Sequence, residues 1–226
     1  MNYILENYDS IAENVAKLSN GRTRLLAVSK TFPVENIELL YSERGVKEFA
    51  ESRLNELQAK YEALPKDIIW HYIGKIQSNK LKKIAAIAGV IHSVEKVETI
   101  EKLAEICEKN NSRISYFIEV NISQESSKSG IAESEINSLL ETAKKYSSQV
   151  KCVGFMTMAP LDASNEELDN YFSRMRELLE QKRQEFKLET LTELSMGMSG
   201  DYPFAIKNGS TIVRIGSSIF GRRNYL

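Results

Sequence analysis

The stretch RLLAVSKTFPVENIELLYSERGVKEFA (24–50) contains the unit that decides the fold. It begins with a short apolar run, RLLAVS (24–29), continues with a longer segment of helical character, and ends with a second run, VKEFA (46–50). These runs are apolar rather than strictly alternating, which is typical of strands in a parallel sheet covered on both faces. The stretch therefore predicts one strand–helix–strand unit of an α/β fold.

The same alternation continues along the rest of the chain. Six further apolar runs predict strands at 68–73, 89–94, 114–122, 151–157, 192–196 and 211–215. Eight such units in about 200 residues, without a glycine-rich dinucleotide motif, favour a closed barrel over a doubly wound open sheet. We therefore expect residues 1–226 to form a single α/β domain, a (β/α)8 TIM-type barrel.

An extra amphipathic helix precedes the first strand. Its apolar positions recur four and three residues apart, which places them on one face. They are Ile4, Tyr8, Ile11, Val15 and Leu18. Asn20-Gly21 is expected to end this helix.

The composition is that of an ordinary globular domain with balanced charge. The chain has 30 Lys and Arg residues and 31 Asp and Glu residues, so its net charge gives no reason to expect nucleic acid or a membrane as a partner. Cys107 and Cys152 lack the spacing of a disulfide framework or a zinc cluster. No secretory signal is visible, and the longest apolar run, 84–91, is shorter than the roughly 20 residues that span a bilayer. We expect a cytoplasmic monomer.

Two connections rich in glycine and serine indicate a phosphate site. SMGMSGD (195–201) begins in the seventh expected strand, and RIGSSIFG (214–221) begins in the eighth. In barrels of this type the site lies at the carboxyl ends of the strands, and a phosphate often lies after strands seven and eight. The backbone and hydroxyl donors expected to approach the anion belong to Ser199, Gly200, Gly216 and Ser217. Turn and cap chemistry without a ligand is the alternative.

Lys30 follows the first strand, in LLAVSKTFP (25–33), and is expected to project into the mouth of the barrel. Burial lowers the pKa of an amine, and a neutral amine forms a Schiff base with a carbonyl. A lone lysine at a strand end more often reaches solvent. Opposite a phosphate site, however, Lys30 fits pyridoxal 5′-phosphate (PLP), which carries an aldehyde and a phosphate on one ring.

Arg214 lies two residues before Gly216, so strand alternation directs both toward the same face. A guanidinium has donors and no acceptor, so it suits a pyridine nitrogen that is unprotonated. The alternative is an arginine in the barrel interior that pairs with a carboxylate such as Glu119. The sequence favours neither.

Weaker signals come from other positions. Met156, in the GFMT run, fits a core position better than a ligand contact. His71 and His92 lie on different strands without a nearby carboxylate cluster, so a core role fits better than metal ligation. Ser78 or Asn79 is expected to cap the next helix.

Six ordered motifs together resemble the pyridoxal phosphate homeostasis protein family, also described as proline synthetase co-transcribed homologues. This family is related to the amino-terminal barrel of alanine racemase. The motifs are AVSK (27–30), WHYIGKIQSNK (70–80), VNISQESSKSG (120–130), GFMTMAP (154–160), LSMGMSGD (194–201) and VRIGSSIFG (213–221). They extend over nearly the whole chain.

The resemblance implies a fold-type III barrel that binds PLP as a Schiff base with Lys30. It implies that Arg214 faces the pyridine nitrogen. The other cofactor-binding residues would be Ser52, Met156, Ser199, Gly200, Gly216 and Ser217. The implied role is to hold PLP, to deliver it to apo-enzymes, and to keep vitamin B6 and amino-acid pools in balance, without an established reaction.

One motif departs from the family. The usual FGEN run is FAES (49–52) here, so Ser52 replaces an asparagine and the contact of that side chain with the cofactor is weakened. Two other functions stay open. One is that of a small PLP-dependent amino-acid racemase. The other is that of an aldolase that uses Lys30 without a cofactor.

Overall fold

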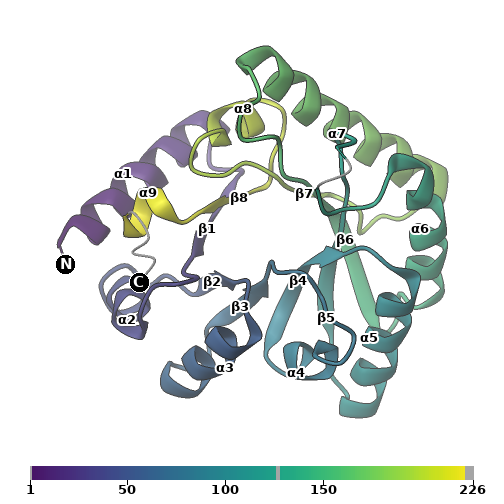
Figure 1. The fold of residues 1–226 in the computed structure, drawn as a ribbon, viewed down its shortest axis with the longest axis horizontal. Coiled ribbons are helices and arrows are strands. Elements are labelled where there is room, and N and C mark those ends of the chain that lie inside the picture. Colours follow the sequence, from purple (N-terminus) through teal and green to yellow (C-terminus); the bar gives the residue numbers. More distant parts are fainter. Residues whose placement is uncertain (1, 126–127, 222–226) are drawn as a thin grey trace.

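Eight parallel strands close into a barrel, and the helices form a ring around it (Figure 1). The computed structural model describes residues 2–125 and 128–221. Each strand pairs with its neighbours in chain order, and β1 pairs with β8 to complete the circle. The expected α/β barrel with an additional N-terminal helix is confirmed.

The strands lie within three residues of the bounds expected from the sequence. They are β1 (Arg24–Val28), β2 (Glu48–Glu51), β3 (Ile69–Tyr72), β4 (Ala88–Val94), β5 (Ile114–Glu119), β6 (Val150–Met156), β7 (Glu193–Ser195) and β8 (Ile212–Ile215). The helices are α1 (Asn2–Ser19), α2 (Val34–Arg44), α3 (Leu54–Ala63), α4 (Leu81–Ala85), α5 (Val97–Asn110), the 3₁₀ helix η1 (Glu133–Glu135), α6 (Ile136–Lys145), α7 (Asn165–Phe186), α8 (Tyr202–Lys207) and α9 (Ser217–Phe220). None of these helices is both long and apolar enough to cross a membrane.

Three details differ from the expectation. β5 ends at Glu119 rather than 122, and Val120, whose N–H still donates to the Met156 carbonyl of β6, forms an isolated bridge with Ile131. Leu18 is exposed, and the end of α1 buries Ser19 instead, whose hydroxyl donates to the Val15 carbonyl. Neither Ser78 nor Asn79 caps α4, which begins at Leu81 after Lys80 without a side-chain cap.

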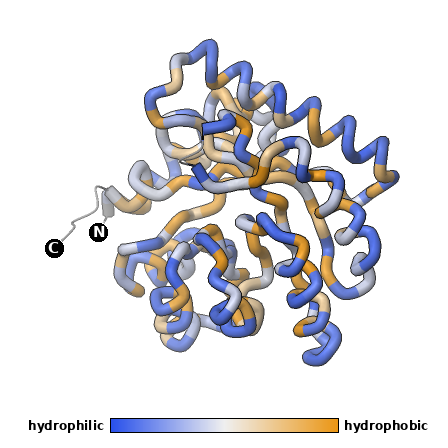
Figure 2. The backbone as a smooth tube through the Cα atoms, turned by 45° about the vertical axis from the view of Figure 1, so that its right-hand side comes forward, coloured by the Kyte–Doolittle hydropathy of each residue, from blue (hydrophilic) through white to orange (hydrophobic). Residues whose placement is uncertain are grey.

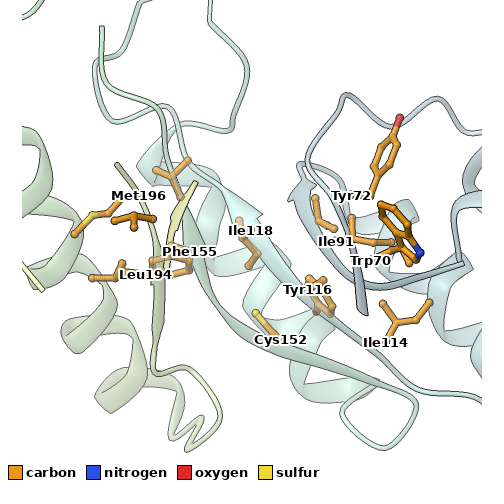
Figure 3. Close-up of a cluster of buried hydrophobic side chains, with 14 of the residues drawn as sticks. Trp70, Tyr72, Ile91, Ile114, Tyr116, Ile118, Cys152, Phe155, Leu194 and Met196 are labelled. Atoms are coloured by element: carbon orange, nitrogen blue, oxygen red, sulfur yellow. The ribbon is translucent and has the colours of Figure 1, made fainter. Parts of the chain in front are cut away.

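Two apolar layers hold the barrel together. The larger layer lies between the strands and the helices, and Figure 3 shows part of it, including Trp70, Tyr116 and Phe155. The smaller layer fills the barrel interior and consists of Leu26, Val28, Ala50, Phe117, Met156 and Ile212. Hydropathy along the chain agrees, since the helices alternate between hydrophilic and hydrophobic positions (Figure 2).

The backbones of β6 and β7 approach each other closely at Gly154. A methyl group added at Gly154 would lie 1.7 Å from the Glu193 carbonyl oxygen, which is backbone and cannot move aside. We expect Gly154→Ala to lower the free energy of unfolding by at least about 2 kcal/mol. Gly89→Ala, on β4, is the control, because the added methyl meets only the Ile69 side chain at 3.6 Å. Urea denaturation of both variants checks this, and equal midpoints would contradict it.

Candidate functional site

A cavity of about 480 Å³ opens at the carboxyl ends of the strands. Its walls come from the ends of β1, β3, β6 and β8 and from the loops that follow β6 and β7. The lining residues are Val28, Lys30, Ile73, Met156, Met158, Pro160, Leu161, Ala163, Asn165, Leu168, Met198, Ser199, Gly200, Asp201, Arg214, Gly216 and Ser217. Its size is that of a pocket for a small organic molecule.

Lys30 lies at the end of β1 beside a buried ion pair that fixes the preceding residue. The Lys60 ammonium donates to the Ser29 carbonyl at 2.8 Å and to Glu51 Oε1 at 2.6 Å. The Ser29 hydroxyl donates to the same carboxylate oxygen at 2.7 Å. Burial raises the pKa of Glu51, and the adjacent Lys60 ammonium opposes that rise. The residue before Lys30 is therefore held through both its carbonyl oxygen and its hydroxyl, which fixes the backbone that leads to Lys30.

Serine hydroxyls from the β7–α8 loop and from the start of α9 converge on the adjoining wall. Ser199 Oγ accepts a hydrogen bond from the Ser217 hydroxyl at 3.2 Å and one from the Ser218 N–H at 3.4 Å. Gly216 lies close beside them, and a Cβ at this position would crowd the Val28 carbonyl oxygen at 3.1 Å. The β8–α9 connection therefore lies directly against the end of β1, which carries Lys30.

Asp201 shapes the β7–α8 loop and was not singled out from the sequence. Its carboxylate accepts a hydrogen bond from the Met198 N–H. Burial raises the pKa of Asp201, and this hydrogen bond opposes the rise. Gly197 has φ 93°, and a Cβ there would lie 2.6 Å from Ala205 Cβ, so the loop also needs this glycine. Together these features fix the turn that presents Ser199.

Arg214 lies at the floor of the cavity with its guanidinium held by the barrel wall. One terminal nitrogen donates to the carbonyl and hydroxyl oxygens of Ser195 at 2.6 and 2.8 Å, and the other donates to the Thr157 carbonyl at 2.9 Å. Three of its five N–H donors are thus used, and two have no partner among the described residues. Burial lowers the pKa of Arg214 to about 10, so it is cationic at neutral pH.

The alternative pairing of Arg214 with Glu119 is not observed. Among the described residues, no carboxylate lies within ion-pair distance of Arg214. Glu119 is buried nearby, and burial together with the charge of Glu95 raises its pKa to about 7. The charges of Arg214 and Lys75 oppose that rise without cancelling it.

Seven of the eight residues expected at the site line this one cavity: Lys30, Met156, Ser199, Gly200, Arg214, Gly216 and Ser217. Ser52 is not among the lining residues, and its backbone packs closely against Gly74 instead. The sequence analysis did not predict the apolar rim of the cavity, which Met158 and Leu161 form. Leu161 is 95% exposed. Within the described ranges, no group of three or more histidine, cysteine or acidic residues is suited to a metal ion.

The buried Glu119 predicts a pH dependence of stability in the cofactor-free protein. Its pKa rises from 4.5 to about 7 on folding, so its contribution is complete below pH 4.5 and is lost as the pH rises through 7. A difference of this size corresponds to about 3 kcal/mol. Glu119→Gln should therefore be increasingly more stable than the wild type between pH 4.5 and 7. Denaturation at several pH values measures this, and a constant difference would contradict it.

Comparison with known proteins agrees with this geometry. The family model described as alanine racemase, N-terminal domain, matches residues 6–224. A protein of Aquifex aeolicus named pyridoxal phosphate homeostasis protein is 36% identical over 223 residues, which cover 98% of this chain and 96% of that one. A protein of Synechocystis with the same name is 39% identical, over 88% of this chain and 91% of its own.

Solved structures give the same result. PipY of Synechococcus elongatus without PLP superimposes with a TM-score of 0.88 at 32% identity, and covers 96% of this chain and 100% of its own. PipY with PLP bound gives a TM-score of 0.84 at 31% identity, with the same coverage. The resemblance expected from the six motifs is thus confirmed. The chain belongs to the alanine racemase N-terminal domain family, among the relatives that are named pyridoxal phosphate homeostasis proteins.

Proposed function

We propose that this chain binds PLP through Lys30 and serves PLP homeostasis without turning over amino acids. The observation that carries the proposal is the convergence of an amine, a set of hydroxyl and backbone donors, and a guanidinium on one cavity of about 480 Å³. An aldehyde, a phosphate and a pyridine nitrogen need these three kinds of group. When bound, PLP supplies a carbonyl that links to an amine and a ring that withdraws electrons.

The phosphate would lie at Ser199, Gly200, Gly216 and Ser217. The hydroxyls of Ser199 and Ser217 are 3.2 Å apart and partly exposed to the cavity, so both can turn toward an anion. The glycines carry no side chain that would keep the anion from the backbone. Met156 would lie against the ring, and Lys30 would hold the carbonyl carbon covalently.

Arg214 would face the pyridine nitrogen with the N–H donors that the protein leaves unused. Because a cationic guanidinium donates and does not accept, the nitrogen facing it stays unprotonated. An unprotonated ring is a weaker electron sink than one paired with a carboxylate. The same group that orients the ring therefore disfavours removal of an α-proton, which racemisation requires.

The names of the relatives and the PLP-bound PipY structure support a role in holding PLP for use elsewhere. We propose that PLP held in this cavity is delivered to apo-enzymes that depend on it. In this way the chain would contribute to the balance of vitamin B6 and amino-acid pools.

The covalent link can be tested directly. We expect Lys30→Ala to abolish the violet absorption of the PLP-loaded protein while the fold is retained, because no amine remains at the end of β1. Borohydride reduction followed by mass spectrometry should label Lys30 in the wild type. Lys75→Ala, an exposed lysine after β3, is the control and should keep the absorption. Labelling of Lys75, Lys80 or Lys128 in place of Lys30 would refute the assignment.

The phosphate should supply much of the affinity. A hydrogen bond to a charged group contributes about 1.5–3 kcal/mol, so Ser199→Ala should weaken PLP binding roughly ten- to a hundredfold. Pyridoxal, which lacks the phosphate, should bind much more weakly to the wild type, and Ser199→Ala should leave that weak affinity unchanged. Fluorescence titration gives the four dissociation constants. Equal affinities for PLP and pyridoxal would show that the serines do not hold a phosphate.

We expect no useful racemisation of amino acids. The PLP-loaded protein is incubated with L-alanine and a panel of other L-amino acids, and D-isomers are measured by chiral chromatography. Turnover should stay far below the rate of about 1 per second that is common for enzymes, because Arg214 leaves the ring a weak sink. Turnover at that rate or faster would make the racemase function the correct one.

A further inference from the structure

A row of polar side chains, four of them buried and the last one half-buried, crosses the barrel interior from Arg214 to the opposite rim. Its members come from β8, β7, β4, β3 and β2 in that order, and they are Arg214, Ser195, His92, His71 and Glu48. Nothing in the binding of PLP at the cavity uses the last three. We call this row the interior chain.

The contacts along the interior chain are short. Arg214 donates to Ser195 Oγ at 2.8 Å, and Ser195 Oγ lies 2.8 Å from His92 Nδ1. His92 Nε2 lies 2.8 Å from His71 Nδ1. His71 Nε2 then lies 3.2 Å from Glu48 Oε2, within ion-pair distance but without the alignment of a hydrogen bond.

The two ends of the interior chain fix the position of every proton in it. Arg214 can only donate, and an ionised Glu48 can only accept. The Ser195 hydroxyl therefore accepts from Arg214 and has its own proton free for His92 Nδ1. His92 then carries its proton on Nε2 and donates to His71 Nδ1, which leaves the His71 proton on Nε2, facing Glu48. With the opposite order, the Ser195 proton would have no acceptor among the described residues.

Burial and charge agree with this order. His71, His92 and Ser195 are completely buried, and the ring of His92 stacks on Phe117 with centroids 4.5 Å apart. Burial is the main cause that holds the pKa of His92 well below its usual range, and the charge of Arg214 adds to it, so His92 is neutral. The pKa of Glu48 is lowered, chiefly by its contact with His71, so Glu48 is ionised.

We propose that Ser195, His92, His71 and Glu48 are positioning residues that hold the Arg214 guanidinium at the cavity floor through one fixed order of protons. The fixed order keeps a lone pair of Ser195 directed at Arg214, so the unused N–H groups of Arg214 stay directed at the cavity. The purpose of this orientation rests on the proposed function, because the group that Arg214 would meet there is the pyridine nitrogen of PLP.

The amino-terminal rim offers a matched pair of variants. Arg24 binds two carboxylates there, Glu48 at 3.3 Å and Glu193 at 2.6 Å, and both side chains are 30% exposed. Glu48 belongs to the interior chain and Glu193 does not. Glu48→Gln and Glu193→Gln therefore remove the same charge from the same arginine, and only the first replaces the acceptor at the end of the interior chain.

The first measurement uses the cofactor-free protein. The chain has only two histidines, so ¹⁵N-labelled histidine gives two spin systems that single variants assign. At pH 7 we expect both rings to be neutral with the proton on Nε2. Glu48→Gln should convert this into a mixture of tautomers at both histidines, whereas Glu193→Gln should leave it unchanged. A proton on His92 Nδ1, a cationic ring, or equal effects of the two variants would overturn the proposal.

The second measurement concerns the cofactor. Ser195→Ala should weaken PLP binding about tenfold and shift the pH profile of the absorption of bound PLP, because Arg214 loses an acceptor that orients it. Ser93→Ala is the control, since Ser93 is an equally buried serine on β4 whose hydroxyl donates to the Gly74 carbonyl outside the interior chain. Equal effects of the two variants would overturn the positioning role.

The two arms also separate this inference from the proposed function. If the wild-type protein binds no PLP, the proposed function fails, whereas the tautomers in the cofactor-free protein still test the order of protons. If PLP binds and the tautomers are not those expected, only the interior chain is refuted.

Discussion

Parallel pairing between β1 and β8 closes the barrel, and the whole site depends on this pairing. The register sets Leu26 opposite Arg214 and Ala27 opposite Ile215. It places the end of β1, which leads to Lys30, against the β8–α9 connection with its serines. A slip of one residue would turn Arg214 away from the interior, because side chains alternate between the faces of a strand. The closure thus joins residues that lie more than 180 positions apart in sequence.

Local hydrogen bonds and opposite charges explain how several charged groups are tolerated in and around the barrel. A buried charge is costly unless hydrogen bonds and opposite charges compensate it. Lys60 donates to Glu51 and to the Ser29 carbonyl, and Glu51 also accepts from the Ser29 hydroxyl. Arg214 donates to two carbonyl oxygens and a hydroxyl. Glu119 lacks such partners among the described residues, and its pKa rises accordingly. Arg214, at the floor of the cavity, is therefore better compensated than Glu119.

The sequence predicted the barrel and most of the cavity, because both depend on local signals. Apolar runs mark the strands, and strand ends in a barrel share one rim, so Lys30, Ser199 and Gly216 were expected to meet. The contacts of Lys60 with Ser29 and of Ser195 with His92 join residues from different elements that lie far apart in the sequence. No periodicity predicts which polar side chains will pair in this way. The early end of β5 has the same origin, since Val120 pairs with Ile131 through the following loop.

The position of Arg214 connects holding a cofactor with the lack of turnover that we propose. Its three acceptors are the backbone of Ser195 and Thr157 and a hydroxyl on β7, all parts of the barrel wall rather than of a flexible loop. A guanidinium held in this way can orient a ring by donating to its nitrogen, but it has no proton acceptor with which to stabilise a protonated pyridinium. Catalysis through the ring gains from such a protonated nitrogen, whereas retention of the cofactor does not require it. The fixed guanidinium of Arg214 at the floor of the cavity therefore suits a protein that holds its ligand without converting it.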